Sequence, residues 1–162
     1  MADATKKYLV FSIANEHYGI PIQKVREVIR HEAISPVHNA SEFLKGVINL
    51  RGKIIPIIDM RLKLGIVWKE YSDRTVFIIV DVQGDTEQYL FGIAVDAVHE
   101  VASIGDEDLD HLPDVGFRTQ SAYLQGVAKL NQTMVIILNM DRILNTKEIV
   151  SLAAADLIPS SS

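Results

Sequence analysis

The sequence predicts an all-β protein made of two similar lobes, and two observations support this prediction. The stretch from Gly46 to Leu64 recurs from Gly126 to Leu144, with glycine, valine, leucine, isoleucine and methionine at matching places. The apolar runs are short, rich in valine and isoleucine and bounded by turn residues, as is typical of strands. A repeat of about 75 residues is far longer than a solenoid repeat, so each copy is expected to form a lobe with its own core.

An upstream block is duplicated in the same way. The residues from Tyr18 to Val28 match those from Phe91 to Val101, and a strand-like apolar run precedes each block, at residues 8–13 and 75–80. The repeated unit is therefore a strand, a strand-rich block, a variable segment and a final apolar block.

The repeat also sets the expected domain organisation. A chain of 162 residues suits a single domain, residues 1–162, of two small lobes. Lobe 1 is expected at about residues 15–65 and lobe 2 at about 88–145, with the runs at 8–13 and 75–80 completing them. Only the short segment 66–74 separates the lobes, so they are expected to pack directly against each other.

Turn and cap residues punctuate both copies. Arg51 and Gly52 predict a two-residue hairpin turn, because glycine adopts a positive φ readily. Asp59 and Asn139 are both favourable N-cap residues, and each precedes a predicted short helical turn.

Three further segments carry local predictions. Residues 41–44 begin with a serine followed by a glutamate, which indicates a helical turn. Pro56 lies inside a strand-like run and predicts a strand edge or a bulge there. Residues 149–158 are rich in alanine and leucine and predict a C-terminal helix, and the serine-rich tail at 159–162 is expected to be frayed.

The composition argues against several classes of function. The net charge is −5, which disfavours binding to nucleic acid or to an anionic membrane surface. The chain has no cysteine, so disulfide and thiolate chemistry are excluded. No apolar run approaches the roughly 20 residues of a membrane span, and no secretory signal is present. We therefore expect a soluble cytoplasmic protein.

The sequence contains no pattern that predicts catalysis, a metal or a cofactor. The phosphate-binding, nucleophile-elbow and zinc-protease motifs are absent. The acidic residues at 106–110 form a polar segment in which solvated charge is the simplest interpretation. No two of the five histidines have the spacing that places two metal ligands on one helix face: His17, His31, His38, His99 and His111.

The exposed polar residues of the first copy are not repeated in the second. The segment Arg51-Gly52-Lys53 becomes Asn131-Gln132-Thr133, and Lys45 also lies near the first hairpin. Arg26 and Glu27 lie on a strand-like segment. Two interpretations are open: an ordinary solvated surface with ion pairs, or a recognition patch, since arginine is enriched at interfaces.

The duplicated segments resemble a known family. The sequence GVINLRGKIIPIIDMRLKLG, preceded by YGIPIQKVREVIR and followed by YLQGVAKLNQTMVIILNMDRIL, is similar to the bacterial chemotaxis coupling proteins of the CheW family. The resemblance extends from about Tyr8 to Leu152. It implies two five-stranded SH3-like β-barrels related by a pseudo-twofold axis and packed over a shared apolar seam.

The resemblance also implies a function and partners. Members of the family are non-catalytic adaptors that couple the cytoplasmic tips of chemoreceptors, the methyl-accepting chemotaxis proteins, to the regulatory domain of the histidine kinase CheA. The protein is then expected to be monomeric alone and to associate with membrane-bound receptor arrays, without cofactor, nucleic acid or membrane insertion.

Site residues follow from the resemblance alone. Receptor binding is expected around Val25, Glu27, Val28, Gly46 and Arg51, with Glu27 and Arg51 forming a surface pair. Gly46 is explained equally well by a close backbone approach and by a strand leaving a turn.

Kinase binding is expected around Phe117, Tyr123, Leu124 and Gly126. Two other functions remain open at this point. One is an adaptor of a non-flagellar chemosensory pathway. The other is RNA binding by an SH3-like barrel, which the acidic charge disfavours.

Overall fold

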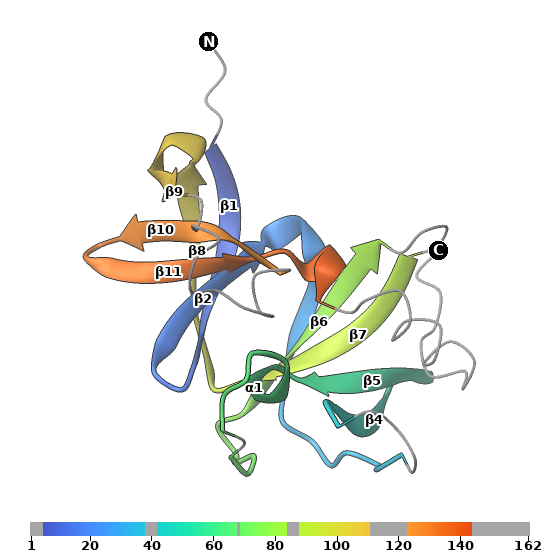
Figure 1. Ribbon diagram of the computed structural model, residues 1–162. Helices are drawn as coiled ribbons and strands as arrows, with labels where there is room; N and C mark the ends of the chain where they lie inside the picture. The colour runs from blue at the N-terminus through green and yellow to red at the C-terminus, as the bar shows by residue number, and fades with distance from the viewer. Residues whose placement is uncertain (1–4, 38–41, 68, 84–87, 111–122, 144–162) are drawn as a thin grey trace.

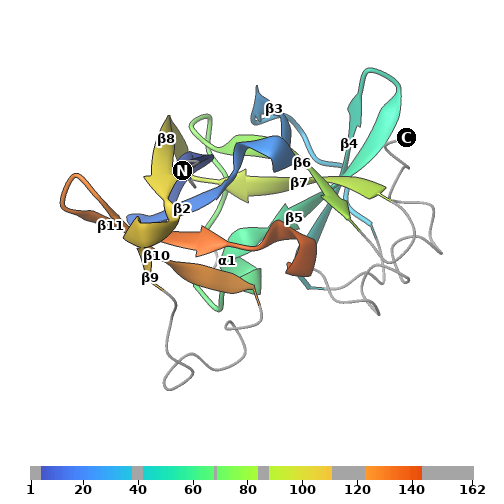
Figure 2. The same ribbon diagram turned by 90° about the horizontal axis from the view of Figure 1, so that it is seen from above.

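The fold is all-β and consists of two sheets that form two lobes (Figures 1 and 2). The computed structural model describes residues 5–37, 42–67, 69–83, 88–110 and 123–143. The first sheet contains β1 (Thr5–Ile13), β2 (Glu16–Pro21), β8 (Ala97–Gly105), β9 (Leu109–Asp110), β10 (Leu124–Leu130) and β11 (Thr133–Leu138). The second sheet contains β3 (Val25–Arg30), β4 (Leu44–Leu50), β5 (Lys53–Asp59), β6 (Val76–Gln83) and β7 (Gln88–Val95). The short helical segments are η1 (Ile22–Lys24), α1 (Met60–Lys63), η2 (Asp106–Asp108) and η4 (Met140–Arg142).

The two sheets have the same internal order, which confirms the duplication. The order is β8-β1-β2-β11-β10-β9 in the first sheet and β3-β6-β7-β5-β4 in the second. Each sheet contains one parallel pair, and the repeated glycines mark it: Gly19 faces Ile137 in one sheet, and Gly92 faces Ile57 in the other. The strand β9, only two residues long, extends the first sheet beyond the five strands that both sheets share.

The two sheets do not coincide with the two expected lobes, because one strand of each expected lobe belongs to the other sheet. β2, inside the expected lobe 1, pairs with β1 and β11, whereas β7, inside the expected lobe 2, pairs with β5 and β6. The chain crosses from one sheet to the other at residues 22–24 and again at Asp96. A duplicated sequence is compatible with copies that close on themselves and with copies that exchange strands, so the periodicity alone does not distinguish them.

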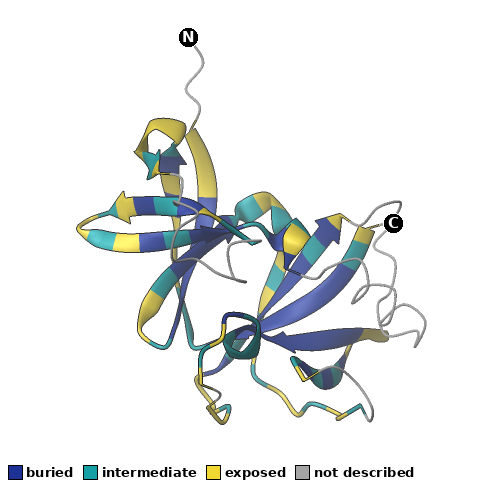
Figure 3. Cartoon of the chain, in the orientation of Figure 1, coloured by how far each residue is buried: buried dark blue, intermediate teal, exposed yellow. Residues whose placement is uncertain are grey.

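A shared apolar core joins the sheets, in agreement with the expected direct packing. Fully buried side chains from both sheets meet in it, including Phe11 and Leu138 from the first and Ile78 and Phe91 from the second. Each sheet also encloses a smaller core of its own, around Ile137 in the first sheet and around Phe77 and Ile79 in the second. Figure 3 shows the buried residues converging where the lobes meet.

Two carboxylates connect the crossing points of the chain. Asp96 accepts hydrogen bonds from the Ala14 amide at 2.8 Å and from Arg61 Nη2 at 2.6 Å. Asp141 accepts from the Gln83 amide at 2.8 Å and from Lys24 Nζ at 2.9 Å. Each carboxylate therefore links residues of both sheets, which fixes the lobes relative to each other.

The predicted caps and turns are present. Asp59 Oδ1 accepts from the Leu62 amide at the start of α1, and Asn139 Oδ1 accepts from the Asp141 amide at the start of η4, both at 3.1 Å. The β4–β5 turn contains Arg51, with φ 51°, followed by a glycine with φ 89°, as expected for a tight hairpin.

The remaining local predictions have different outcomes. Pro56 faces Val47 of β4, but the pairing of β5 with β7 begins only at Ile57, so the proline occupies an edge-like position as predicted. The predicted helical turn at 41–44 is wrong at its end, because Leu44 already begins β4. The predicted C-terminal helix and frayed tail lie outside the described residues.

Candidate protein-binding surfaces

Glu27 and Arg51 form an exposed bidentate ion pair. Arg51 Nη1 donates to Glu27 Oε2 at 3.3 Å, and Nη2 donates to Oε1 in a second, shorter hydrogen bond. The Arg51 side chain is 72% exposed and that of Glu27 is 31% exposed. The hydrogen bonds to Glu27, and then its charge, raise the pKa of the Arg51 guanidinium. The pair presents a planar polar surface to solvent.

A β-bulge and a tight turn bring the pair together. The register between β3 and β6 shifts between Val25 and Glu27, so Arg26 is an extra residue and lies beside Glu27 at the same end of the barrel. On the other side, Arg51 occupies the left-handed region in its turn, and Asn49 Oδ1 accepts from the Gly52 amide at 2.9 Å.

The pair lies at the mouth of the second sheet's barrel. A hollow of about 210 Å³ is lined by Arg26, Glu27, Arg51 and Lys53, with buried aliphatic side chains such as Ile79 at its base. We call this hollow the first mouth.

The other predicted receptor-binding residues have separate positions. Val28 is 44% exposed on β3, and Val25 is half-buried against the shared core. Gly46 is buried in β4 with φ 144°, and a Cβ there would lie 2.2 Å from the Ser35 carbonyl oxygen. Gly46 is therefore needed for a close backbone approach, which decides between the two explanations left open by the sequence.

The structure places three of the four predicted kinase-binding residues at the start of β10. Leu124 packs against the shared core, and a Cβ on Gly126 would lie 2.7 Å from the Asp110 carbonyl oxygen. The Tyr123 hydroxyl donates to the Lys63 carbonyl of α1. Phe117 lies outside the described residues.

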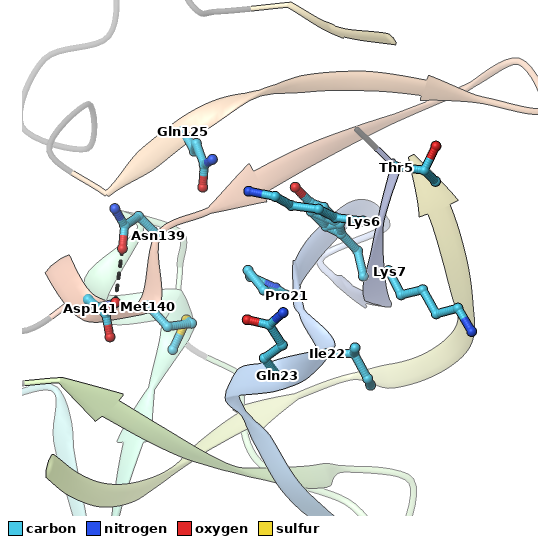
Figure 4. A pocket seen from close by; sticks show the side chains of 11 residues that line it. Thr5, Lys6, Lys7, Pro21, Ile22, Gln23, Gln125, Asn139, Met140 and Asp141 are labelled. Carbon is cyan, nitrogen blue, oxygen red and sulfur yellow. Dashed lines mark hydrogen bonds between the residues drawn. The ribbon is translucent and has the colours of Figure 1, made fainter. Parts of the chain in front are cut away.

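A polar cavity borders this segment, and sequence reasoning did not identify it. It has a volume of about 530 Å³ and lies between the start of β1, η1 and the segment around η4 (Figure 4). Lys6 and Lys7 point to opposite sides, and Gln125 and Asn139 face the space from the other wall. Its lining residues come from segments distant in sequence, so no local pattern indicates it.

The described residues contain neither a metal-binding cluster nor a membrane-spanning helix. In the described part of the chain, no group of three or more histidine, aspartate or glutamate side chains is arranged to hold a metal ion. No helix within the described ranges is long and apolar enough to cross a membrane.

Comparison with known proteins identifies the family. Residues 7–148 match the model of the CheW-like domain. The chain is 34% identical to the chemotaxis protein CheW of Klebsiella aerogenes, over 88% of this chain and 84% of that protein. It is 31% identical to the chemotaxis protein CheW of Thermotoga maritima, over 89% and 92%.

A solved structure supports the same assignment. The crystal structure of the scaffolding protein TtCheW from Thermoanaerobacter tengcongensis matches with a TM-score of 0.77 and 38% sequence identity, over 88% of this chain and 94% of that one. This chain belongs to the CheW-like family.

Proposed function

We propose that this protein is a non-catalytic adaptor that couples chemoreceptors to the histidine kinase CheA in chemotaxis signalling. The observation that carries the proposal is the family match over residues 7–148, almost the whole chain, to proteins named as chemotaxis and scaffolding proteins. The fold suits this role, because two interlocked barrels hold separate surface patches at a fixed distance.

The receptor surface of the proposal is the exposed side of β3 together with the first mouth. Val28 supplies apolar contact area and the pair Glu27–Arg51 supplies directional polar contacts. A receptor tip is a helical hairpin, and its ridge suits binding in helix-in-groove fashion beside Val25. Gly46 supports this surface from inside, by keeping β4 against the segment at Ser35.

The kinase surface of the proposal is the start of β10, with Tyr123, Leu124 and Gly126, and it includes Phe117, which lies outside the described residues. The regulatory domain of the kinase is its partner. Tyr123 and Leu124 are half-buried, so a partner would cover their exposed edges, while Gly126 sets the path of the strand.

In the cell, the protein is proposed to be cytoplasmic, to be recruited to membrane-bound receptor arrays and to be monomeric when isolated. Interfaces of modest area give weak individual contacts. Linked contacts in an array act at high effective concentration, which strengthens the assembly.

The pathway has a second candidate. The chain is also 26% identical to the protein FrzA of Myxococcus xanthus, over 87% of this chain and 86% of that protein. An adaptor role in a different chemosensory pathway is the alternative, with the same kind of partners.

A reconstitution experiment tests the proposal. The protein is combined with receptor-containing membranes and the chemotaxis kinase of the same organism, and kinase sedimentation and autophosphorylation are measured. We expect the protein to bring the kinase to the membranes and to change its activity. If the protein binds neither receptor nor kinase, the proposed function is wrong.

A further inference from the structure

The first sheet's barrel has a mouth that matches the first mouth position by position. This second mouth is a hollow of about 180 Å³ at the same end of the β10–β11 hairpin. The sequence repeat and the common strand order relate every residue that lines it to one that lines the first mouth. At their bases, for example, Leu130 and Val135 correspond to Leu50 and Ile55.

The second mouth keeps the carboxylate of the first mouth but not its arginine. Glu100 stands in the place of Glu27, whereas Asn131 stands in the place of Arg51 and a threonine in the place of Lys53. Among the described residues, Glu100 makes no ion pair, and it is exposed. The mouth therefore carries a negative charge without the cation that neutralises it in the other lobe.

Two stacked imidazoles form the wall beside this carboxylate. His17 and His99 have ring centroids 4.8 Å apart and planes inclined by 26°. Their counterparts in the first mouth are Leu90 and Arg26, so the aromatic wall is specific to the second mouth.

The position of His99 follows from a bulge. The register of β1 with β8 shifts between Val10 and Phe11, which face Glu100 and Val98, so His99 is the extra residue. The bulge brings His99 and Glu100 to the same mouth, as the β3 bulge does for Arg26 and Glu27 in the other lobe.

We infer that the second mouth is a socket for an arginine side chain of a partner protein. A guanidinium stacks on planar aromatic faces and pairs bidentately with a carboxylate, and the second mouth offers both features together. The incoming arginine takes the place that Arg51 occupies within the first mouth. This contact goes beyond the proposed receptor and kinase surfaces, and it involves none of their residues.

The shape and charge favour arginine over other ligands. Lysine has no planar group to stack on His17 and His99, and a neutral side chain leaves Glu100 unpaired. A metal ion held by the two imidazoles is the main competing occupant, and the experiment below includes it.

The test is an NMR titration of the isotope-labelled full chain with N-acetyl-arginine amide. We expect saturable shifts at the amides of His17, His99, Glu100 and Asn131, with millimolar affinity because a single side chain is bound. N-acetyl-citrulline amide has nearly the same shape without the charge, and we expect it to bind at least about tenfold more weakly.

Three variants locate the binding. Glu100→Gln is expected to weaken binding at least about tenfold. Its matched control, Glu27→Gln in the first mouth, should change the affinity less than about twofold. Asn131→Arg supplies the missing arginine from within, so it should abolish binding of the probe while the rest of the spectrum remains that of the folded protein.

The inference is overturned by any of four results. The first is that citrulline amide binds as tightly as the arginine probe. The second is that the shifts map to the first mouth. The third is that binding persists in Glu100→Gln or Asn131→Arg. The fourth result is that Zn²⁺ shifts His17 and His99 stoichiometrically while the arginine probe causes no shifts, which would identify a metal site instead.

Discussion

At the scale of single residues, the exposed pair Glu27–Arg51 is the most distinctive feature of the surface. A tight turn places Arg51 in the left-handed region, and a bulge turns Glu27 toward it. Both devices are local, and the pair is formed in the free protein. Preorganisation of this kind lowers the entropic cost of binding.

Charge reversal at Arg51 should weaken partner binding while the fold survives. In Arg51→Glu, two carboxylates face each other at the mouth and the bidentate pair is lost, so we expect at least about tenfold weaker association with receptor or kinase. Lys69→Glu places a negative charge on an exposed residue outside both proposed binding surfaces and is the control. Pull-down together with circular dichroism measures both, and unchanged binding by a folded Arg51→Glu variant would contradict the role.

Tyr18 should make the protein less stable at alkaline pH. Burial, reinforced by the hydrogen bond to Glu16 at 2.9 Å, raises the pKa of Tyr18 above its usual value of about 10. Above that pH the unfolded chain releases the hydroxyl proton while the folded chain keeps it. The unfolded state then binds fewer protons, so the free energy of unfolding falls as the pH rises.

Chemical denaturation between about pH 9 and pH 11 measures this dependence. Tyr18→Phe should flatten the decline, whereas Tyr89→Phe, at a half-buried position, serves as the matched control. An equal decline in the wild type and in Tyr18→Phe would show that Tyr18 is not responsible.

At the scale of elements, β4 depends on the absence of a side chain at Gly46. We expect Gly46→Ala to lower the free energy of unfolding by about 2–4 kcal/mol, because the new Cβ meets the Ser35 carbonyl and the backbone has φ 144°. Gly52→Ala is the control, since no atom lies within 4 Å of its Cβ position. Its cost should be about 1–2 kcal/mol, from the positive φ alone. Urea denaturation compares them, and equal losses would argue against the steric explanation.

The local elements could be predicted from the sequence, and their partners could not. The caps at Asp59 and Asn139 depend on residues a few positions away, so they are visible in the sequence. The pairing of Gly19 with Ile137 depends on a contact across most of the chain, which periodicity does not reveal.

The candidate site shows the same division. The sequence alone indicated Arg51 as unusual, because the second copy lacks it, but its pairing with Glu27 came from the family resemblance. The bulges that place Arg26 and His99 at the two mouths leave no mark in composition or spacing. The large cavity beside Gln125 escaped prediction for the same reason, since its walls are assembled from distant segments.

At the scale of the whole molecule, the exchange of strands predicts that both lobes unfold together. Val135 is buried in the first sheet's own core, away from the shared one. We expect Val135→Ala to cost about 2 kcal/mol. Hydrogen-exchange protection should then fall by the same amount in β10–β11 and in β4–β5, because the two sheets share one buried core and the chain crosses between them twice.

Hydrogen exchange followed by mass spectrometry separates the two outcomes. Protection lost only in β10 and β11 would show that the lobes open independently. Ile55→Ala, the counterpart of Val135 in the second sheet's own core, is the corresponding variant and should likewise lower protection in both hairpins.

The crossing of the chain between the sheets also determines how the molecule can be divided. A cut within residues 69–74 separates β1 to β5 from β6 to β11, yet each sheet draws strands from both pieces. Neither fragment contains a complete sheet, so each would become ordered only by complementing the other. The two fragments should therefore fold only when they are mixed, and their association would report directly on the formation of both barrels.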